Sequence, residues 1–325
     1  MLYTTLGKTN LKVSRIGFGA WGIGGGAKNL KWEGMWKADD STSKATLSKA
    51  YKNGINFYDT ALEYGNGHSE RLIKEVLNKN GIVIATKVPP KDMHWPAIDD
   101  DINNVFPKDY IIQKAKESYK NLGRTIDILQ LHVWSDRWFD NDGWRDAFQV
   151  LRKEGIARFF GVSINDHNPD SAMKLVKSGE IDTIQVIYNI FDQSPRDKLF
   201  PLAKKKNVGI IARVPLDEGS LSGTFTYNTT FNDFRKDYFA KDRLKITVDK
   251  VNKIKDKLVN QKRATAQIAL KFCLLDGGAD VAIVGMRNPN RVEENVKSVD
   301  IEFTDEEIKF LESQRWIRNF YPEDV

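Results

Sequence analysis

Four polar residues stand out because each lies at or just after the end of a short apolar segment. Asp59 and Lys87 lie at the ends of INFYDT and IVIATKV, His132 lies at the end of IDILQLHV, and Tyr64 follows Asp59 by five residues. A charged residue at the end of an apolar strand is costly unless it is paired, and an Asp and a Lys on adjacent strands can pair. Taken singly, these residues are consistent with a structural ion pair and an unrelated tyrosine and histidine.

Taken together, the same four residues predict a proton relay. A lysine ammonium beside a phenol lowers the pKa of the phenol, and an aspartate keeps that lysine charged. A tyrosine of this kind can protonate a carbonyl oxygen while hydride arrives at the carbonyl carbon, and a neighbouring histidine can orient the carbonyl group. The combination indicates reversible carbonyl reduction.

The elements that must position these residues alternate between strand and helix. Eight segments are short, β-branched and almost continuously apolar, which is typical of strands buried on both faces of a parallel sheet. They are residues 15–21, 55–60, 82–88, 126–133, 157–164, 183–190, 208–216 and 281–287. Amphipathic helical segments separate them, and several begin with Ser, Asp or Pro and end with Gly or Asn.

Eight such units without a linker or a shift in composition favour a single closed (β/α)₈ TIM barrel of the α/β class, although an open doubly wound sheet also alternates. Residues 1–14 predict an N-terminal hairpin outside the repeat, and residues 305–325 a C-terminal tail helix, so residues 1–325 are expected to form one barrel domain. In such barrels, the chemistry lies at the C-terminal ends of the strands, where the four polar residues fall.

Composition excludes several other classes of protein. The chain has 325 residues, of which 41% are hydrophobic, and the single cysteine, Cys273, excludes an internal disulfide. His68, His94 and His167 lack metal-ligand spacing and are expected at the surface or at helix caps, so no metal site is predicted. The net charge of +6 suits an anionic ligand better than nucleic acid, and the lack of long apolar segments predicts a cytoplasmic protein without a membrane partner.

The sequence resembles the aldo-keto reductase superfamily, in particular its bacterial-type aldo/keto reductases. The similarity is carried by NFYDTALEYGNGHSE, IATKV and IDILQLHVW, and it continues through ARFFGVSIND, TIQVIYNIFDQSP, IIARVPLDEGSLSG and IVGMRNPNRVEEN to span nearly the whole chain. The resemblance implies a (β/α)₈ barrel and a nicotinamide cofactor. It also implies a catalytic tetrad in which Tyr64 is the general acid in reduction and the base in oxidation, namely Asp59, Tyr64, Lys87 and His132.

The resemblance further implies that the cofactor is NADP(H) rather than NAD(H). Ser163, Asn165 and Gln185 would hold the nicotinamide carboxamide, the loop LDEGSLSG would offer N–H groups to the pyrophosphate, and two arginines near a helix start would bind the 2′-phosphate. The complete set of expected cofactor contacts is Trp21, Ser163, Asn165, Gln185, Arg213, Leu216, Glu218, Ser220, Gly285, Arg287, Arg291, Glu294 and Asn295.

The chain departs from the family pattern at three positions. Ile164 separates Ser163 from Asn165, Arg213 stands where an aromatic residue often stacks on the nicotinamide, and Gly285 aligns with a lysine that some members use near the 2′-phosphate. The segments GFGAWG and GIGGGA match a Rossmann fingerprint, but no helix is expected before Ser41. These glycines are instead expected to let a loop pass close to cofactor or substrate.

Tryptophans gather at or beyond the predicted strand ends and have two interpretations. They either pack the loops or form an aromatic wall for an aldehyde, ketone or sugar. They are Trp21, Trp32, Trp36, Trp95, Trp134 and Trp138. Two other functions remain open, a cofactor-sensing regulatory protein like the potassium-channel β subunits of this family and a sugar dehydrogenase that works oxidatively with NAD(P)⁺. Monomer and homo-oligomer are both compatible with the sequence.

Overall fold

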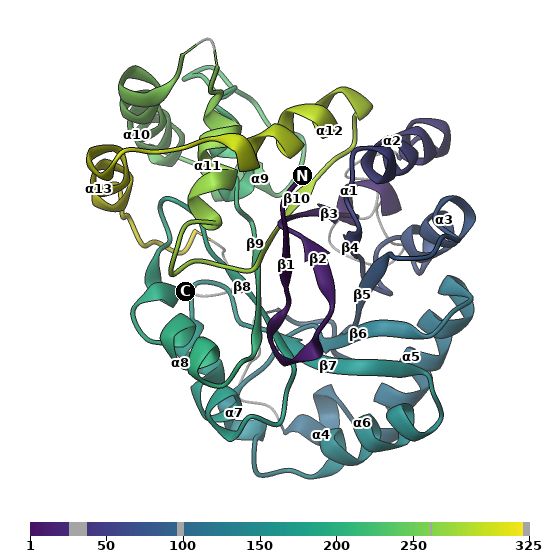
Figure 1. The fold of residues 1–325 in the computed structure, drawn as a ribbon. Coiled ribbons are helices and arrows are strands. Elements are labelled where there is room, and N and C mark those ends of the chain that lie inside the picture. The colour runs from purple at the N-terminus through teal and green to yellow at the C-terminus, as the bar shows by residue number, and fades with distance from the viewer. Residues whose placement is uncertain (26–37, 96–100, 261, 321–325) are drawn as a thin grey trace.

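A computed structural model describes residues 1–25, 38–95, 101–260 and 262–320. Eight parallel strands form a closed barrel in the order β10-β3-β4-β5-β6-β7-β8-β9 (Figure 1). They are β3 (Ile16–Gly19), β4 (Phe57–Asp59), β5 (Val83–Val88), β6 (Ile126–Leu131), β7 (Ala157–Ser163), β8 (Thr183–Ile187), β9 (Gly209–Arg213) and β10 (Val281–Gly285). Each strand lies within a predicted segment. The first and last strands of the barrel pair with each other, so the barrel is confirmed and the open doubly wound sheet is excluded.

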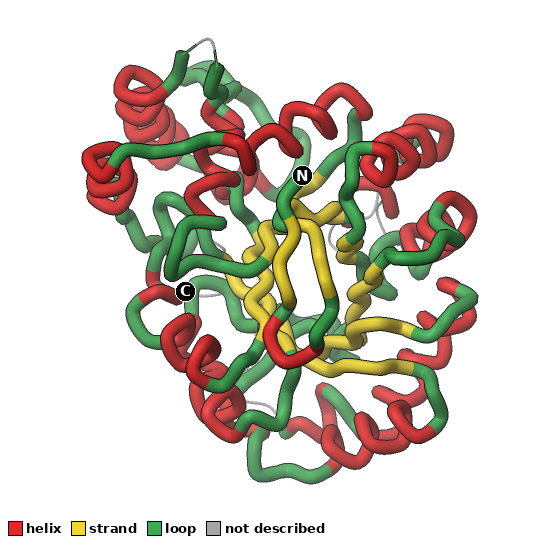
Figure 2. Tube along the Cα trace, viewed as in Figure 1, coloured by secondary structure: helices red, strands yellow, loops and turns green. Residues whose placement is uncertain are grey.

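Helices surround the barrel, as the tube in Figure 2 shows. The longer ones are α2 (Asp40–Lys52), α3 (His68–Val76), α5 (Lys108–Leu122), α6 (Gly143–Lys153), α7 (Met173–Ser178), α8 (Leu199–Lys205), α10 (Arg243–Leu258), α11 (Thr265–Cys273), α12 (Pro289–Val296) and α13 (Asp305–Ser313). Among the described residues, α1 (Trp21–Gly24), α4 (Ile102–Val105) and α9 (Arg235–Tyr238) are single-turn α-helices. The turn α1 lies where the sequence predicted no helix. Its glycines disfavour a long helix, but four residues are enough to form a single turn. No helix of the described residues is long and apolar enough to cross a membrane.

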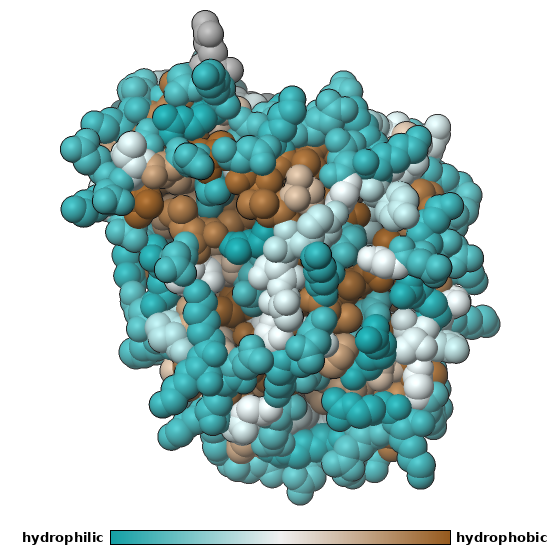
Figure 3. All heavy atoms as spheres, in the orientation of Figure 1, coloured by the Kyte–Doolittle hydropathy of each residue, from teal (hydrophilic) through white to brown (hydrophobic). Residues whose placement is uncertain are grey.

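The predicted N-terminal hairpin is present and closes one end of the barrel. Strands β1 (Tyr3–Thr5) and β2 (Lys12–Ser14) pair antiparallel and lie across the barrel end in Figures 1 and 2. Leu6 and Val13 are fully buried there against apolar side chains of the barrel strands. In the same orientation, most of the surface is hydrophilic (Figure 3). Because this end is plugged, the opposite end, formed by the C-terminal ends of the strands, is left for the site.

The C-terminal tail is helical over a shorter range than predicted. Helix α13 ends at Ser313, and residues 314–320 continue as an irregular segment. This segment returns to the barrel, since the Trp316 amide donates a hydrogen bond of 2.9 Å to the Phe191 carbonyl and the two rings meet edge to face.

Candidate active site

A buried ion pair lies at the C-terminal end of the barrel. Lys87 on β5 donates hydrogen bonds of 2.6 Å to Asp59 Oδ1 and 2.8 Å to the Thr60 carbonyl. The other Asp59 oxygen accepts a 2.7 Å hydrogen bond from Gln185 on β8, which lies opposite β4 in the strand order. Both oxygens of Asp59 are therefore paired, and their partners come from two sides of the barrel.

Tight turns after β4 bring Tyr64 to this ion pair. The Tyr64 amide donates to the Ala61 carbonyl at 3.1 Å, and the Gly67 amide donates to the Leu62 carbonyl at 2.6 Å. Gly65 has a φ of +64°, and a Cβ there would lie 2.0 Å from the Gly24 carbonyl oxygen, so the two loops cross at a glycine. The Lys87 ammonium lies 5.2 Å from the centroid of the Tyr64 ring.

The pKa of Tyr64 shifts in the direction opposite to the sequence-based expectation. Burial raises the pKa of Tyr64 well above its usual value, and the charges of Glu63 and Asp59 raise it further, whereas Arg213 lowers it. The expected net lowering of this pKa is therefore not found, because burial is the largest influence on the phenol, and the Lys87 ammonium is engaged by the Asp59 carboxylate. The phenol therefore holds its proton at neutral pH, as a general acid requires.

His132 follows β6 and lies beside Tyr64. Its amide donates a 3.0 Å hydrogen bond to the Val88 carbonyl at the end of β5, and its ring centroid is 6.0 Å from that of Tyr64. Trp95 contacts the same imidazole edge to face at 5.5 Å. Glu63 Oε1 lies 2.5 Å from His132 Nδ1. Sequence reasoning missed Glu63, because an acidic residue in a polar loop gives no signal of burial.

The residues expected to hold the nicotinamide gather at the ends of β7, β8 and β9. Ser163 and Gln185 are register partners and are buried, and Asn165 is also buried. Arg213 donates a 2.9 Å hydrogen bond to the Ile164 carbonyl and pairs with Asp166. The guanidinium is thus held over the β7 end, beside the expected carboxamide contacts.

The loop after β9 begins with strained backbone. Asp217 and Glu218 both have positive φ, and Gly219 has a φ of +97°. The Gly219 amide donates to the Leu216 carbonyl at 3.0 Å, so this N–H group, expected to be offered to the pyrophosphate, is used within the loop. The Ser220 hydroxyl donates to Asp217 Oδ2 at 2.6 Å. The described loop is therefore already ordered by its own hydrogen bonds.

The two arginines expected to bind a phosphate lie at the surface near the start of α12. Arg287 is exposed, and Arg291, with 57% of its side chain exposed, donates a 2.6 Å hydrogen bond to Glu294. A Cβ at Gly285 would meet no atom within 4 Å, so open space lies beside the end of β10. Asn295 is buried on the inner side of α12.

Comparisons with known proteins agree with this arrangement. The model of the Aldo/keto reductase family matches residues 15–315. The chain belongs to the aldo/keto reductase family. The family includes oxidoreductases such as a methylglyoxal reductase, and its members use nicotinamide cofactors.

Individual relatives of this aldo/keto reductase carry different activities in their names. Aldo-keto reductase YhdN of Bacillus subtilis is 31% identical over 307 residues, which cover 90% of this chain and 87% of the relative. The NADH-specific methylglyoxal reductase of Escherichia coli is 27% identical over 314 residues, which cover 92% of this chain and 94% of the relative. Among solved structures, the glycerol dehydrogenase AKR11B4 of Gluconobacter oxydans has a TM-score of 0.75 at 28% identity and covers 96% of this chain and 94% of that chain.

The tryptophans of this aldo/keto reductase divide between core and site. Trp134 and Trp138 are buried and pack edge to face with each other, so they support the loops. Trp95 contacts His132, whereas Trp21 is partly exposed and meets Phe234 edge to face at 6.1 Å. Trp32 and Trp36 lie outside the described residues.

Two of the histidines that were not predicted to bind a metal have polar contacts in the structure. His68 Nδ1 lies 3.0 Å from the Gly24 carbonyl oxygen at the start of α3. The expectation of a surface or capping position is wrong for His167, whose side chain is only 5% exposed and lies 2.6 Å from Asp192. An isolated loop histidine carries no sequence signal of such a partner.

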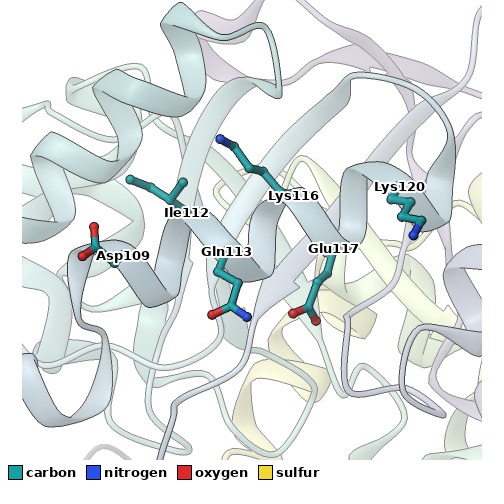
Figure 4. A pocket seen from close by; sticks show the side chains of 6 residues that line it. All are labelled: Asp109, Ile112, Gln113, Lys116, Glu117 and Lys120. Carbon is teal, nitrogen blue, oxygen red and sulfur yellow. The ribbon is translucent and has the colours of Figure 1, made fainter.

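The outer face of α5 carries a separate shallow hollow, shown in Figure 4. It is lined by Asp109, Ile112, Gln113, Lys116, Glu117 and Lys120. These side chains follow helical spacing along one exposed face of α5 and include none of the residues described above. The hollow is therefore a feature of the helix surface and not part of the site.

Proposed function

We propose that this protein reduces an aldehyde or ketone to an alcohol with NADP(H), with Tyr64 as the proton donor. The observation that carries the proposal is the Tyr64 hydroxyphenyl group, which is held beside Lys87 and His132 while burial keeps its pKa high. A protonated phenol at the mouth of the barrel is suited to donate a proton to a carbonyl oxygen. Lys87 and Asp59 form the buried ion pair next to this phenol.

The described residues fit a nicotinamide dinucleotide. Exposed Arg287 and Arg291 offer cationic donors to phosphate near the start of α12, and open space lies next to Gly285. Ser163, Asn165 and Gln185 would hold the carboxamide at the ends of β7 and β8. The bound cofactor would supply hydride to the carbonyl carbon. Tyr64 would give its proton to the carbonyl oxygen, and His132 would orient that oxygen.

Replacement of Tyr64 by Phe tests the proton-donor role. We expect Tyr64→Phe to lower kcat for NADPH-dependent reduction by roughly 10²- to 10⁴-fold, because the packing of the ring is kept and only the hydroxyl is lost. Tyr110→Phe is the matched control, since burial also raises the pKa of Tyr110, to about 12, but this residue lies on α5. A Tyr64→Phe enzyme with near wild-type turnover would exclude the proposed role.

The preference for NADP(H) rests on Arg287 and Arg291. Arg291 pairs with Glu294 at the surface, and we infer that a 2′-phosphate would replace this carboxylate as its partner. Arg291→Ala should then weaken NADPH binding about tenfold or more and leave NADH binding nearly unchanged, as measured by fluorescence titration. Equal losses for the two cofactors would remove the assigned role. The comparison is needed because the methylglyoxal reductase among the relatives is NADH-specific.

Oxidation of a polyol or sugar by the same site is the second candidate, favoured by the structural likeness to a glycerol dehydrogenase. The same residues would act in reverse, with Tyr64 accepting the proton of the alcohol. A panel of aldehydes, ketones, polyols and aldoses, assayed in both directions, separates the two functions by kcat/KM. Turnover in either direction argues against a purely cofactor-sensing role.

A further inference from the structure

Glu63 is a buried carboxylate in contact with the imidazole of His132. Its side chain is 4% exposed, and Oε1 lies 2.5 Å from Nδ1 of His132, whose side chain is 13% exposed. The contact does not have hydrogen-bond geometry, since His132 Nδ1 and Glu63 Oε2 both lack a hydrogen-bond partner among the described residues. A buried carboxylate with an unpaired oxygen is costly unless a nearby group offers it a proton or a positive charge.

The other titratable groups near Glu63 do not offer that charge. Burial raises the pKa of Tyr64, Tyr110 and Glu70, and the negative charge of Glu63 raises each of these pKa values further. Lys87 is engaged by Asp59, and Arg213 pairs with Asp166. His132 is therefore the group in direct contact that can carry a proton toward the Glu63 carboxylate.

We propose that Glu63 is a positioning residue for His132, which holds the imidazole with a proton on Nδ1 and favours its doubly protonated, cationic form. A neutral imidazole has one N–H group, so with that proton on Nδ1 the Nε2 atom is only an acceptor. The lone pair on Nε2 would then repel the lone pairs of a carbonyl oxygen. The imidazolium donates from both nitrogens and can serve Glu63 and the substrate at once.

The inference deepens the proposed carbonyl reduction and rests on it. As hydride brings two electrons to the carbonyl carbon, the π pair of the C=O bond moves onto oxygen, and oxygen takes the proton of the Tyr64 hydroxyl. His132 keeps both of its protons throughout. Its Nε2–H group stabilises the negative charge that develops on oxygen, which is where a preorganised charged donor contributes most.

The variant Glu63→Gln tests this role because it keeps the shape of the side chain and an oxygen acceptor for Nδ1–H but removes the charge. We expect kcat for reduction at neutral pH to fall by about 100-fold and the KM for the cofactor to stay unchanged. Activity should partly recover as the pH is lowered, because the solvent then protonates the ring.

Glu70→Gln is the matched control. Glu70 is also a buried carboxylate, but it accepts hydrogen bonds from Thr86 and Asn121 and does not contact His132. Loss of stability in this variant is expected, whereas its pH profile should match the wild type. An unchanged pH profile in Glu63→Gln, whatever its rate, would reduce Glu63 to a packing residue and overturn the inference.

Nitrogen NMR of ¹⁵N-histidine-labelled protein gives a readout that needs no turnover, with the His132 signals identified from a His132→Asn sample. In the wild type, the imidazolium signature of His132 should persist to higher pH than in Glu63→Gln. Identical titration of His132 in both proteins would overturn the inference even if reduction is found. A clear difference in a protein that reduces no carbonyl would instead support the pairing and count against the proposed function.

Discussion

Two buried ion pairs in this protein are built in different ways. Lys87 and Asp59 lie on adjacent barrel strands and are 28 residues apart, whereas Arg318 in the C-terminal tail reaches Asp217 in the loop after β9, 101 residues away. Both pairs are at least nine-tenths buried. Lys87 uses its protons on Asp59 and the Thr60 carbonyl.

Arg318 satisfies only part of its guanidinium by hydrogen bonds. Its Nη2 donates to both Asp217 oxygens, at 2.7 and 2.6 Å, while Nε and Nη1 have no hydrogen-bond partner among the described residues. The guanidinium carbon instead lies over the rings of Trp316 and Phe320, at 4.4 and 5.2 Å from their centroids. The compact ammonium of Lys87 fits among the closely packed barrel strands, whereas the flat guanidinium of Arg318 contacts the aromatic rings of the tail. The first pair positions the proposed chemistry, and the second ties the tail to the loop expected to hold the pyrophosphate.

The largest effect is expected from Lys87→Met. This change leaves the Asp59 charge buried without its cation, so the free energy of unfolding should fall by about 3–5 kcal/mol, and turnover should fall by roughly 10³-fold. Urea unfolding and steady-state assays measure the two losses. The double variant Asp59→Asn/Lys87→Met removes both charges and should regain most of the stability but no activity. If the double variant were as unstable as Lys87→Met, the loss of stability would not come from leaving the Asp59 charge unpaired.

Arg318→Met should lower stability by a similar or smaller amount, about 3 kcal/mol, because Asp217 is left buried and unpaired. It should also weaken cofactor binding through the loop after β9, while the rate of hydride transfer at saturating cofactor stays close to wild type. Single-turnover kinetics separate these effects. Arg315→Ala is the control from the same tail, since its partner Asp197 is half exposed, and a loss within about 1 kcal/mol is expected. Similar losses in the two variants would show that burial does not distinguish the two arginines.

The smallest expected effect is the loss, at acid pH, of the stability that Asp192 contributes. Burial alone would raise the pKa of Asp192, but hydrogen bonds from His167 and Ser194 outweigh it and hold this pKa below its usual value. The stability from this carboxylate is therefore present above about pH 4, its value in unfolded chains, and is lost as the pH falls through the lower folded pKa. Asp192→Asn should cost about 2 kcal/mol at pH 7 and less at pH 3, as measured by urea unfolding. Equal costs at both pH values would contradict this assignment.

Sequence patterns predicted the barrel because its strands are buried on both faces and therefore appear as continuous apolar segments. They also identified Asp59, Lys87 and His132, since polar residues at the ends of such segments stand out. Glu63, Asp217 and Arg318 gave no comparable signal, because each lies in a polar loop or tail where a charged residue is ordinary. Their burial depends on segments that meet only in the folded chain.

The sequence by itself determined the architecture, the order of the strands and the end of the barrel where polar side chains gather, because periodicity and strand ends are local properties. Only the tertiary structure decided the charge balance of the site. The raised pKa of Tyr64 and the contact of Glu63 with His132 depend on burial and on distances across the barrel mouth. Electrostatic interactions fall with distance and grow with burial, and neither quantity is written in the local order of residues.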